Sequence, residues 1–371
     1  MTTDGDVRTP QEVARRAEVA SQLSGRVVMM TGASEGTGEY VAAEIPGIEV
    51  IAGMRFVKDR KTGVIDPGKT TAKFEKVANQ IGVERTLPFI ADITNDEEVG
   101  VAYSKLKEQG KYPTDVILSA AGGLEGALIV KMISVLRGLQ RGKRNAEQGI
   151  TETISGTPAT TYTGEQVDEK LAQFEIEISE EIEAQMPAAE AINVTANINL
   201  LEKIKESKQK GEITGDMRVI FYSSTPSTFF GEDLDEDGND RTPFFYTGVA
   251  QTKNKFEKWM EEHWQEYAEV GIYFGILSMH LILGTRVHEF FEQQLKPFVS
   301  EETWKAVEPG FIDQSLAYEA TEQMLVEDIS KWKNGVRRLY AVGDKILEEM
   351  TVGDENYATI DMPFEKFAQA A

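Results

Sequence analysis

Short apolar runs alternate with longer amphipathic stretches along most of the chain. The runs hold three to six residues, which suits buried strands, and in stretches such as 70–80 and 96–109 apolar residues recur at helical spacing. Strands that alternate with helices are typical of a parallel sheet with helices on both faces, so we expect a doubly wound α/β fold. The predicted strands are 26–30, 50–52, 87–91, 116–118, 219–222 and 272–277.

The regions outside this alternation predict how the chain is organised. With 371 residues, of which 41% are hydrophobic, the chain can bury one large core and carry additions. No internal repeat or low-complexity linker divides it. We expect an N-terminal helical extension in 1–24 and one core domain in 25–290, with insertions at about 126–185 and 229–243. The C-terminal extension, 291–371, is predicted to be helical until about residue 350 and to end in a short tail.

Composition and charge exclude several classes of protein. The chain has no cysteine, which excludes disulfides, thiolate metal sites and thiol catalysis, and its three scattered histidines argue against a histidine metal site. A formal net charge of −23 argues against binding to nucleic acid or to an anionic membrane surface. No apolar run reaches 18 residues, and the charged N-terminus does not resemble a secretory signal, so we expect a cytoplasmic protein.

A glycine-rich turn directly follows the first predicted strand. Residues 31–38 read Thr-Gly-Ala-Ser-Glu-Gly-Thr-Gly, and a helix is expected to begin beside them. A buried strand that leads through such a turn into a helix can bind a dinucleotide, because the glycines let the backbone approach the pyrophosphate and the helix N-terminus offers free N–H groups. A glycine-rich turn alone is weak evidence, since many serve only as turns.

The spacing T-G-x-x-x-G-x-G resembles that of the short-chain dehydrogenase/reductase superfamily. The resemblance implies a Rossmann-type fold and a cofactor held at this turn by Thr31, Gly32, Ser34, Gly36, Thr37 and Gly38. Ser119, followed by Ala-Ala-Gly, is similar to the family's N-N-A-G, with Ser119 and Ala120 replacing two asparagines, which predicts weaker side-chain bracing there. Further cofactor-binding residues implied by the resemblance are Asp92, Ile93, Ala120, Ala121, Gly122 and Thr285, the last without the family's preceding Pro-Gly.

The end of the second predicted strand bears on the choice between the two nicotinamide cofactors. Arg55 stands there, where an acidic residue would bind the ribose hydroxyls of NAD and repel a 2′-phosphate. We therefore expect NADP(H) to be favoured over NAD(H), although Glu35 stands where many NADP-binding relatives carry a basic residue. A solvated basic loop is the alternative.

The resemblance also implies a catalytic group. In the family, a Tyr and a Lys share one helix, a Ser ends the fifth strand, and an Asn lies on the preceding helix. The matching residues are Tyr246, Lys253, Ser224 and Asn193, with Ser223 as the fallback for the serine.

The spacing of this Tyr and Lys departs from the family's ordinary Y-x-x-x-K. Val249 stands where that spacing would put the Tyr, and the Y-x6-K present is similar to that of enoyl-acyl-carrier-protein reductases. Four residues turn a helix by about 400° and seven by about 700°, so both return near one face, the second with a longer reach. A longer reach of the Tyr from the Lys suits reduction of an enoyl group, so we slightly favour enoyl reduction over carbonyl reduction. Because the glycine motif is the ordinary one, a carbonyl reductase of the 3-ketoacyl type stays open, as does a catalytically inactive nucleotide-binding sensor.

The two insertions suggest contacts with a substrate. The first has five cations and no acid between residues 126 and 146, so 131–144 is expected either to meet the phosphates of coenzyme A or an acyl carrier protein, or to be a solvated helix end. The second begins with Phe229-Phe230 and is followed by Phe244-Phe245, which predicts an apolar wall for the substrate. Its acidic loop resembles the start of a calcium loop, but Phe244 occupies the twelfth position, so we expect no metal. A homo-oligomer is also expected.

Overall fold

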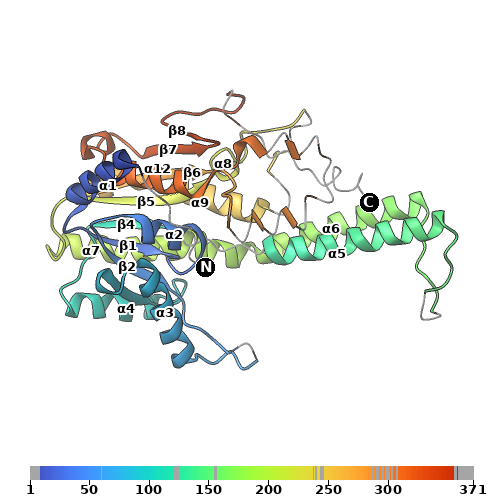
Figure 1. The fold of residues 1–371 in the computed structure, drawn as a ribbon, viewed down its shortest axis with the longest axis horizontal. Helices are drawn as coiled ribbons and strands as arrows, with labels where there is room; N and C mark the ends of the chain where they lie inside the picture. The colour runs from blue at the N-terminus through green and yellow to red at the C-terminus, as the bar shows by residue number, and fades with distance from the viewer. Residues whose placement is uncertain are drawn as a thin grey trace.

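The structure of the protein is a computed structural model. It describes residues 9–59, 61–119, 125–153, 157–236, 238, 240–242, 246–285, 288–289, 292–293, 296, 301, 304–305, 308–354 and 357, with only the backbone of 125–129. Figure 1 shows a layered body from which a pair of long helices, α5 and α6, projects to one side.

Eight strands form one sheet in the centre of the body, in the order β3-β2-β1-β4-β5-β6-β7-β8. All neighbouring strands are parallel except β7 and β8, which are antiparallel. The strands are β1 Val27–Thr31, β2 Glu49–Met54, β3 Thr86–Ile90, β4 Asp115–Leu118, β5 Met217–Ser224, β6 Ile272–Met279, β7 Arg337–Val342 and β8 Lys345–Leu347. Strand order reverses between β1 and β4, which is where open parallel sheets bind ligands, outside the carboxyl ends of the strands.

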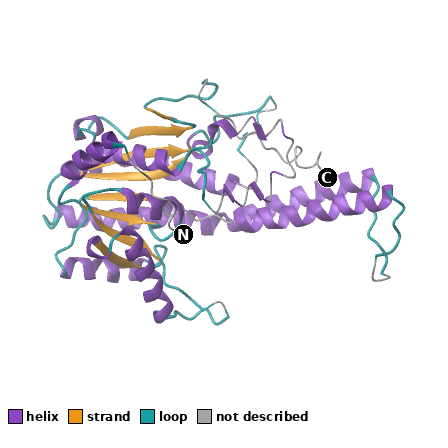
Figure 2. Ribbon diagram, in the orientation of Figure 1, coloured by secondary structure: helices purple, strands orange, loops and turns teal. Residues whose placement is uncertain are grey.

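Helices cover both faces of this sheet (Figure 2). Because successive side chains of a strand point to opposite faces, Met30 of β1 packs into one buried cluster and Met29 into the other. The helices over the first cluster are α1 (Pro10–Leu23), α2 (Gly36–Glu44), α3 (Pro67–Ile81) and α12 (Gln314–Val326). Those over the second are α4 (Asp96–Glu108), α7 (Ala196–Gln209) and α9 (Thr247–Ala268). The predicted Rossmann-type doubly wound α/β fold is confirmed, with all six predicted strands in place.

The helical prediction for the C-terminal extension is wrong for part of it. The segment contains α12 and two short 3-10 turns, η6 (Glu308–Gly310) and η7 (Ile329–Trp332), but β7 and β8 then form strands that extend the sheet beyond β6. This segment therefore belongs to the core body, and the boundary expected at residue 290 does not separate it from the sheet.

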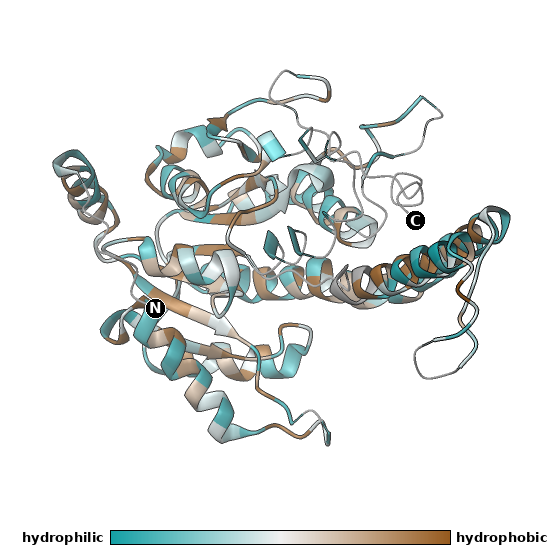
Figure 3. Ribbon diagram, turned by 45° about the vertical axis from the view of Figure 1, so that its right-hand side comes forward, coloured by the Kyte–Doolittle hydropathy of each residue, from teal (hydrophilic) through white to brown (hydrophobic). Residues whose placement is uncertain are grey.

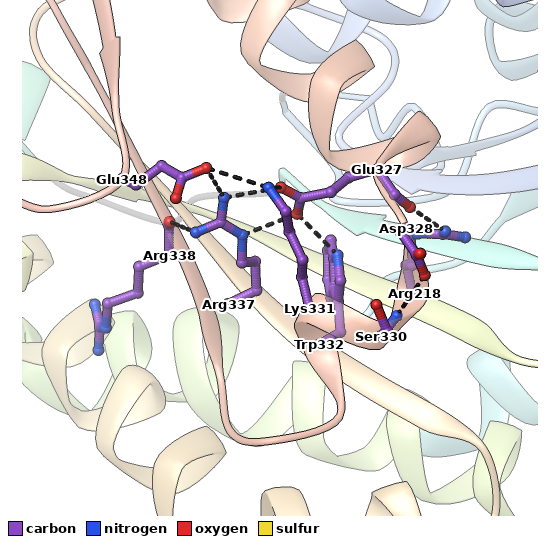
Figure 4. A network of polar contacts seen from close by, with 9 residues as sticks. All are labelled: Arg218, Glu327, Asp328, Ser330, Lys331, Trp332, Arg337, Arg338 and Glu348. Carbon is purple, nitrogen blue, oxygen red and sulfur yellow. Dashed lines mark hydrogen bonds and ion pairs between the residues drawn. The ribbon is translucent and has the colours of Figure 1, made fainter.

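A network of charged side chains anchors β7 to the turn after α12 (Figure 4). The Arg337 guanidinium donates to both oxygens of Glu327, at 2.8 Å each, and to Glu348 on the far side of β8 at 2.7 Å. The indole of Trp332, which is fully buried, donates to Glu327 at 3.2 Å. A bidentate Arg–carboxylate contact fixes geometry as well as supplying attraction, so it holds the last parallel strand in position.

The projecting pair consists of α5 (Glu125–Glu147) and α6 (Gly164–Glu190), so the first insertion is largely helical (Figure 3). Buried side chains of both helices form an apolar cluster, together with Trp304 and Phe311 from the C-terminal segment. The cluster residues on the two helices are Met132, Ile133, Leu136, Leu139, Val167, Leu171, Phe174 and Ile178. We call this set, with Trp304 and Phe311, the hairpin cluster. Within the described residues, no helix is both long enough and apolar enough to cross a membrane.

Candidate active site

The glycine turn has the backbone geometry that a close ligand approach needs. Gly32 and Gly36 have φ angles of +70° and +63°, in the left-handed region that glycine adopts most readily. Gly38 lies in the first turn of α2, and a Cβ placed on it would stand 2.6 Å from the carbonyl oxygen of Gly32 and 2.6 Å from Ser119 Oγ. The turn therefore accepts only glycine at this position. The structure brings the predicted residues Thr31, Gly32, Ser34, Gly36, Thr37 and Gly38 together here.

The start of α2 faces the same edge of the sheet. Its N-cap residue, Glu35, makes no side-chain capping hydrogen bond and instead lies 3.2 Å from Lys73 Nζ on α3. The first backbone N–H groups of a helix have no partner within the helix, so this terminus can bind an anionic group.

Ser119 braces the turn from the end of β4. Its backbone N–H donates to Thr31 Oγ1 at 3.1 Å, and its hydroxyl donates to the Thr31 carbonyl oxygen. Ser119 therefore braces the turn even with a side chain shorter than asparagine, because its hydroxyl reaches the neighbouring strand. Ala120, Ala121 and Gly122 lie outside the described residues.

Arg55 and Asp92 lie near one another at the ends of the neighbouring strands β2 and β3. Burial opposes ionisation of Asp92, but hydrogen bonds from Thr94, with the positive charges of Arg55 and Lys58, outweigh it and lower the pKa of Asp92. Arg55 itself is exposed, and Ile93 is half-buried beside Asp92. This corner therefore presents an ionised carboxylate and an accessible guanidinium together.

The structure brings Tyr246 and Ser224 into contact. Ser224 is the last residue of β5, and Tyr246 Oη donates to Ser224 Oγ at 3.0 Å. Both side chains are half-buried, so their hydroxyls can meet a small molecule. Helix α9 begins at Thr247, and its N-cap, Tyr246, has backbone angles in the right-handed helical region, with φ −104° and ψ −9°. The contact with Ser224 also holds the phenol in place.

Lys253 lies inside α9, on the side facing β5. Its ammonium donates to the carbonyl oxygen of Tyr222 at 3.2 Å, and its side chain is buried. The neighbouring Thr252 accepts a hydrogen bond from Asn193 Nδ2 at 2.8 Å, so Asn193 is tied to the same helix. Val249 is buried, so it cannot offer a side chain to the same space as Tyr246.

Asn193 lies in a π-helical turn, η2 (Ala191–Thr195), between α6 and α7. Such turns are rare and frequently occur at functional sites. The carbonyl oxygen of Asn193 accepts from Asn197 Nδ2 at 2.9 Å, one turn further along.

The alternatives to Ser224 and Tyr246 have other partners. Ser223 donates its hydroxyl to the buried carboxylate of Glu257, on the opposite face of β5. The Tyr222 hydroxyl lies 2.6 Å from Thr321 Oγ1 under α12, and burial raises the pKa of Tyr222. Neither can serve as a fallback at this site.

A polar network lies behind this site, and no sequence motif indicated it. Glu257, one turn after Lys253, is buried, accepts from Arg338 Nη1 of β7 at 2.7 Å, and lies 3.0 Å from the hydroxyl of Thr228. Thr228 belongs to α8 (Thr225–Thr228), the short helix that follows β5. Burial raises the pKa of Glu257, although these donors oppose the rise. The sequence feature that could have indicated this network is Glu257, a charged residue on the apolar side of α9.

The apolar surroundings of Tyr246 come from the hairpin cluster. Tyr246, Leu281 and Leu283 are partly buried against it. Phe229, expected to wall a substrate site, instead packs with Tyr340 of β7, their ring centroids 6.0 Å apart, and that expectation is wrong for Phe229. Phe244 and Phe245 lie outside the described residues.

Thr285 has a local structural role, and the acidic loop was expected to bind no metal. Thr285 donates to the carbonyl oxygen of Ile282 at 2.8 Å and accepts from the backbone of His288 at 3.2 Å, so it stabilises its own turn. In the described part of the acidic loop, and elsewhere among the described residues, no group of three or more His, Asp or Glu side chains could hold a metal ion.

Comparison with known proteins adds evidence on the fold. The sequence matches no protein-family model. It also matches no curated protein. The structure is similar to a short-chain type dehydrogenase/reductase from Mycobacterium ulcerans, with 13% identity, a TM-score of 0.52, and coverage of 86% of this chain and 89% of that one.

It is also similar to a 3-oxoacyl-[acyl-carrier protein] reductase with bound NAD from Brucella melitensis. That match has 11% identity and a TM-score of 0.50, and it covers 92% of this chain and 97% of the other. At such low identity the likeness concerns the fold. The fold predicted from the glycine motif is thereby confirmed: this chain has the fold of the short-chain dehydrogenase/reductase superfamily.

Proposed function

We propose that the protein is an NAD(P)H-dependent oxidoreductase of the short-chain dehydrogenase/reductase type. The observation that carries the proposal is the 3.0 Å contact between Tyr246 Oη and Ser224 Oγ. The two hydroxyls meet at the carboxyl end of β5, on the edge of the sheet that also holds the glycine turn. A pair of hydroxyls at this edge can bind and protonate one substrate oxygen.

The residues present fit a nicotinamide nucleotide. The start of α2 has room for a pyrophosphate at Gly36, where a Cβ would meet no atom within 4 Å. Gly38 instead packs closely against Gly32 and Ser119, which keeps the turn tight. Asp92 would hold the adenine end, and Arg55 favours a 2′-phosphate, hence NADP(H) over NAD(H). When bound, the cofactor supplies the hydride.

The side chains supply the proton and hold the substrate. Tyr246 donates its phenolic proton to the substrate oxygen, while Ser224 orients that oxygen with a hydrogen bond. The positive charge of Lys253, buried in α9, favours the ionised phenol and would also hold the ribose hydroxyls of the cofactor. Asn193, tied to α9 through Thr252, would hold a water that returns the proton.

The substrate proposed is an apolar molecule with a keto or enoyl group, an acyl thioester among the candidates. The hairpin cluster beside Tyr246 supports the apolar character. The Y-x6-K spacing slightly favours the enoyl group, because it gives Tyr246 a longer reach from Lys253, and reduction of a carbonyl of the 3-ketoacyl type is the alternative.

The basic stretch 131–144 gives less support to a coenzyme A or carrier-protein contact than its sequence suggests. Lys131 Nζ lies 2.6 Å from a carboxylate oxygen of Glu181 on α6, so its charge is paired within the hairpin. Arg141, Lys143 and Arg144 are exposed near the outer end of α5, whereas Gly248 of α9 contacts α6 at Ile182 and Met186, roughly 25 Å away along the hairpin.

The proposal is tested by oxidation of NADPH with acetoacetyl and crotonyl thioesters. Turnover of the first identifies a carbonyl reductase and turnover of the second an enoyl reductase. We expect Tyr246→Phe to lower turnover by about 100-fold with little change in cofactor affinity, because it removes a positioned acid. Tyr112→Phe, which removes a half-buried hydroxyl elsewhere, serves as the control. NADPH binding without turnover of either thioester would instead identify a nucleotide-binding sensor.

A further inference from the structure

The hydroxyl of Ser224 lies between two other hydroxyls. Tyr246 Oη donates to it at 3.0 Å, and Ser227 Oγ lies 2.5 Å from it on the opposite side of the contact, in α8. Ser224 is half-buried, whereas Ser227 is completely buried. Each hydroxyl has one hydrogen to donate and can accept two, so the direction of the Ser224–Ser227 hydrogen bond decides what Ser224 can do for a substrate.

Burial of Ser227 fixes that direction. Among the described residues, Ser224 Oγ is the one hydrogen-bond partner of Ser227 Oγ. If Ser224 donated to Ser227, the hydrogen of Ser227 would be buried without an acceptor, which is costly. The arrangement in which Ser227 donates to Ser224 leaves no buried donor unpaired.

We propose that Ser227 is a positioning residue that keeps Ser224 a hydrogen-bond donor. With its oxygen accepting from Ser227, Ser224 has its own hydrogen left for a substrate oxygen, and the hydrogen of Tyr246 can then turn from Ser224 to the same oxygen. This role rests on the proposed reductase function, and it gives Ser227 a part in the reaction without contact with the substrate.

Side chains of α9 hold Ser227 in place. Asn254 Nδ2, next to Lys253, donates to the carbonyl oxygen of Ser227 at 2.9 Å, and Asn254 is buried. Glu257, one turn later, lies 3.0 Å from the hydroxyl of Thr228. The four-residue α8 is thus attached to the helix that carries Lys253, so Ser224, Ser227 and Lys253 keep a fixed relation.

The direction of the hydrogen bond can be observed directly. Neutron diffraction from crystals of the deuterated full-length protein should place the Ser227 deuterium between Ser227 Oγ and Ser224 Oγ. A deuterium of Ser224 pointing at Ser227 would overturn the proposal. This measurement needs no turnover, so it tests Ser227 even if the thioester assay contradicts the proposed function.

A double-mutant cycle tests the consequence for the reaction. We expect Ser227→Ala to lower kcat about tenfold, with KM and NADPH affinity little changed, because one hydrogen bond to the positioned donor is lost. In a Ser224→Ala background the same change should have no further effect, since Ser227 acts through Ser224. Equal losses in both backgrounds, or no loss in the first, would overturn the proposal.

Thr225→Val is the matched control. Thr225 lies in the same short helix and is buried, and among the described residues its hydroxyl has no hydrogen-bond partner. Removing this hydroxyl should leave kcat unchanged. A loss equal to that of Ser227→Ala would show that α8 tolerates no buried change, and would overturn a specific role for Ser227.

Discussion

Gly38 has no room for a side chain, which makes it the sharpest single-residue test of the cofactor site. A Cβ there would meet the backbone oxygen of Gly32 and the hydroxyl of Ser119, which itself bonds to Thr31. We expect Gly38→Ala to weaken NADPH binding at least tenfold, because the turn must open. Fluorescence titration measures this.

Gly138→Ala is the control for that substitution. Gly138 lies in α5 with nothing within 4 Å of the added methyl group, so NADPH affinity should not change and the helix should gain about 0.5–1 kcal/mol of stability. Unchanged NADPH affinity in Gly38→Ala would contradict the placement of the pyrophosphate.

Arg55 determines the expected preference for NADP(H). A guanidinium–phosphate contact contributes on the order of 1.5–3 kcal/mol, so wild-type protein should bind NADPH about tenfold or more tightly than NADH. Arg55→Asp should narrow or invert the ratio, because it places a second carboxylate beside Asp92. Lys105→Asp on α4, an exposed position, makes the same change in net charge and should leave the ratio unaltered. Equal affinities in wild-type protein would refute the preference.

Single residues differ in how far sequence alone could place them. Tyr246, Lys253, Ser224 and Asn193 were proposed from their match to the family's motifs, and the structure joins Tyr246 to Ser224 and ties Asn193 to α9. Ser227 was not found, because its importance comes from burial and from one neighbour, neither of which leaves a pattern in the sequence.

At the scale of elements, β7 depends on a carboxylate whose ionisation can be tested. Burial opposes the charge on Glu327, but the hydrogen bonds and charges of Arg337 and Lys331 outweigh it, so the pKa of Glu327 is lowered in the folded protein. A lowered folded pKa gives stability that is present above the unfolded pKa, about 4.3, and is lost as pH falls through the folded value.

Because the pKa of Glu327 is lowered in the folded protein, its contribution to stability should fall as the pH falls. Between about pH 6 and pH 3, the Tm of the wild-type protein should therefore fall more than the Tm of Glu327→Gln. At pH 6 the variant itself should be less stable, since it leaves the guanidinium of Arg337 without its bidentate partner. Glu348→Gln is the control, because this more exposed carboxylate contributes less. Parallel acid profiles for wild type and Glu327→Gln would contradict this account.

Strands that are continuous apolar runs could be predicted from the sequence, whereas the strand β7 and the contact at the start of α9 could not. The six predicted strands are apolar runs, and the sheet buries them on both faces. β7 begins with two arginines, both neutralised by carboxylates in the structure, so its short apolar part, 339–342, lay hidden in a charged segment. The contact between Tyr246, at the start of α9, and Ser224 joins residues 22 apart in the sequence, and motif spacing alone does not show it.

For the molecule as a whole, the N-terminal helix is part of the core rather than an appendage. Leu23 is fully buried, in the same cluster as α2 and α12. We expect Leu23→Ala to lower the free energy of unfolding by about 2–5 kcal/mol, the usual loss for a buried leucine. Val13→Ala, at an exposed position of the same helix, should change it little. Similar denaturation midpoints for Leu23→Ala and wild type would show that α1 is dispensable.

The packing of α1 against α12 joins two helices that lie far apart in the sequence. Arg15 of α1 donates to the buried carboxylate of Glu322 at 2.6 Å, across 307 residues of sequence. A ribosome adds about 5–20 residues each second, so roughly 15–60 s pass between the emergence of α1 and that of its partner. During that interval the apolar side chains of α1 and α2 lack the helix that covers them. The nascent protein therefore exposes an apolar surface on α1 and α2 until α12 has been synthesised. A chaperone that binds apolar segments early in synthesis would protect this surface.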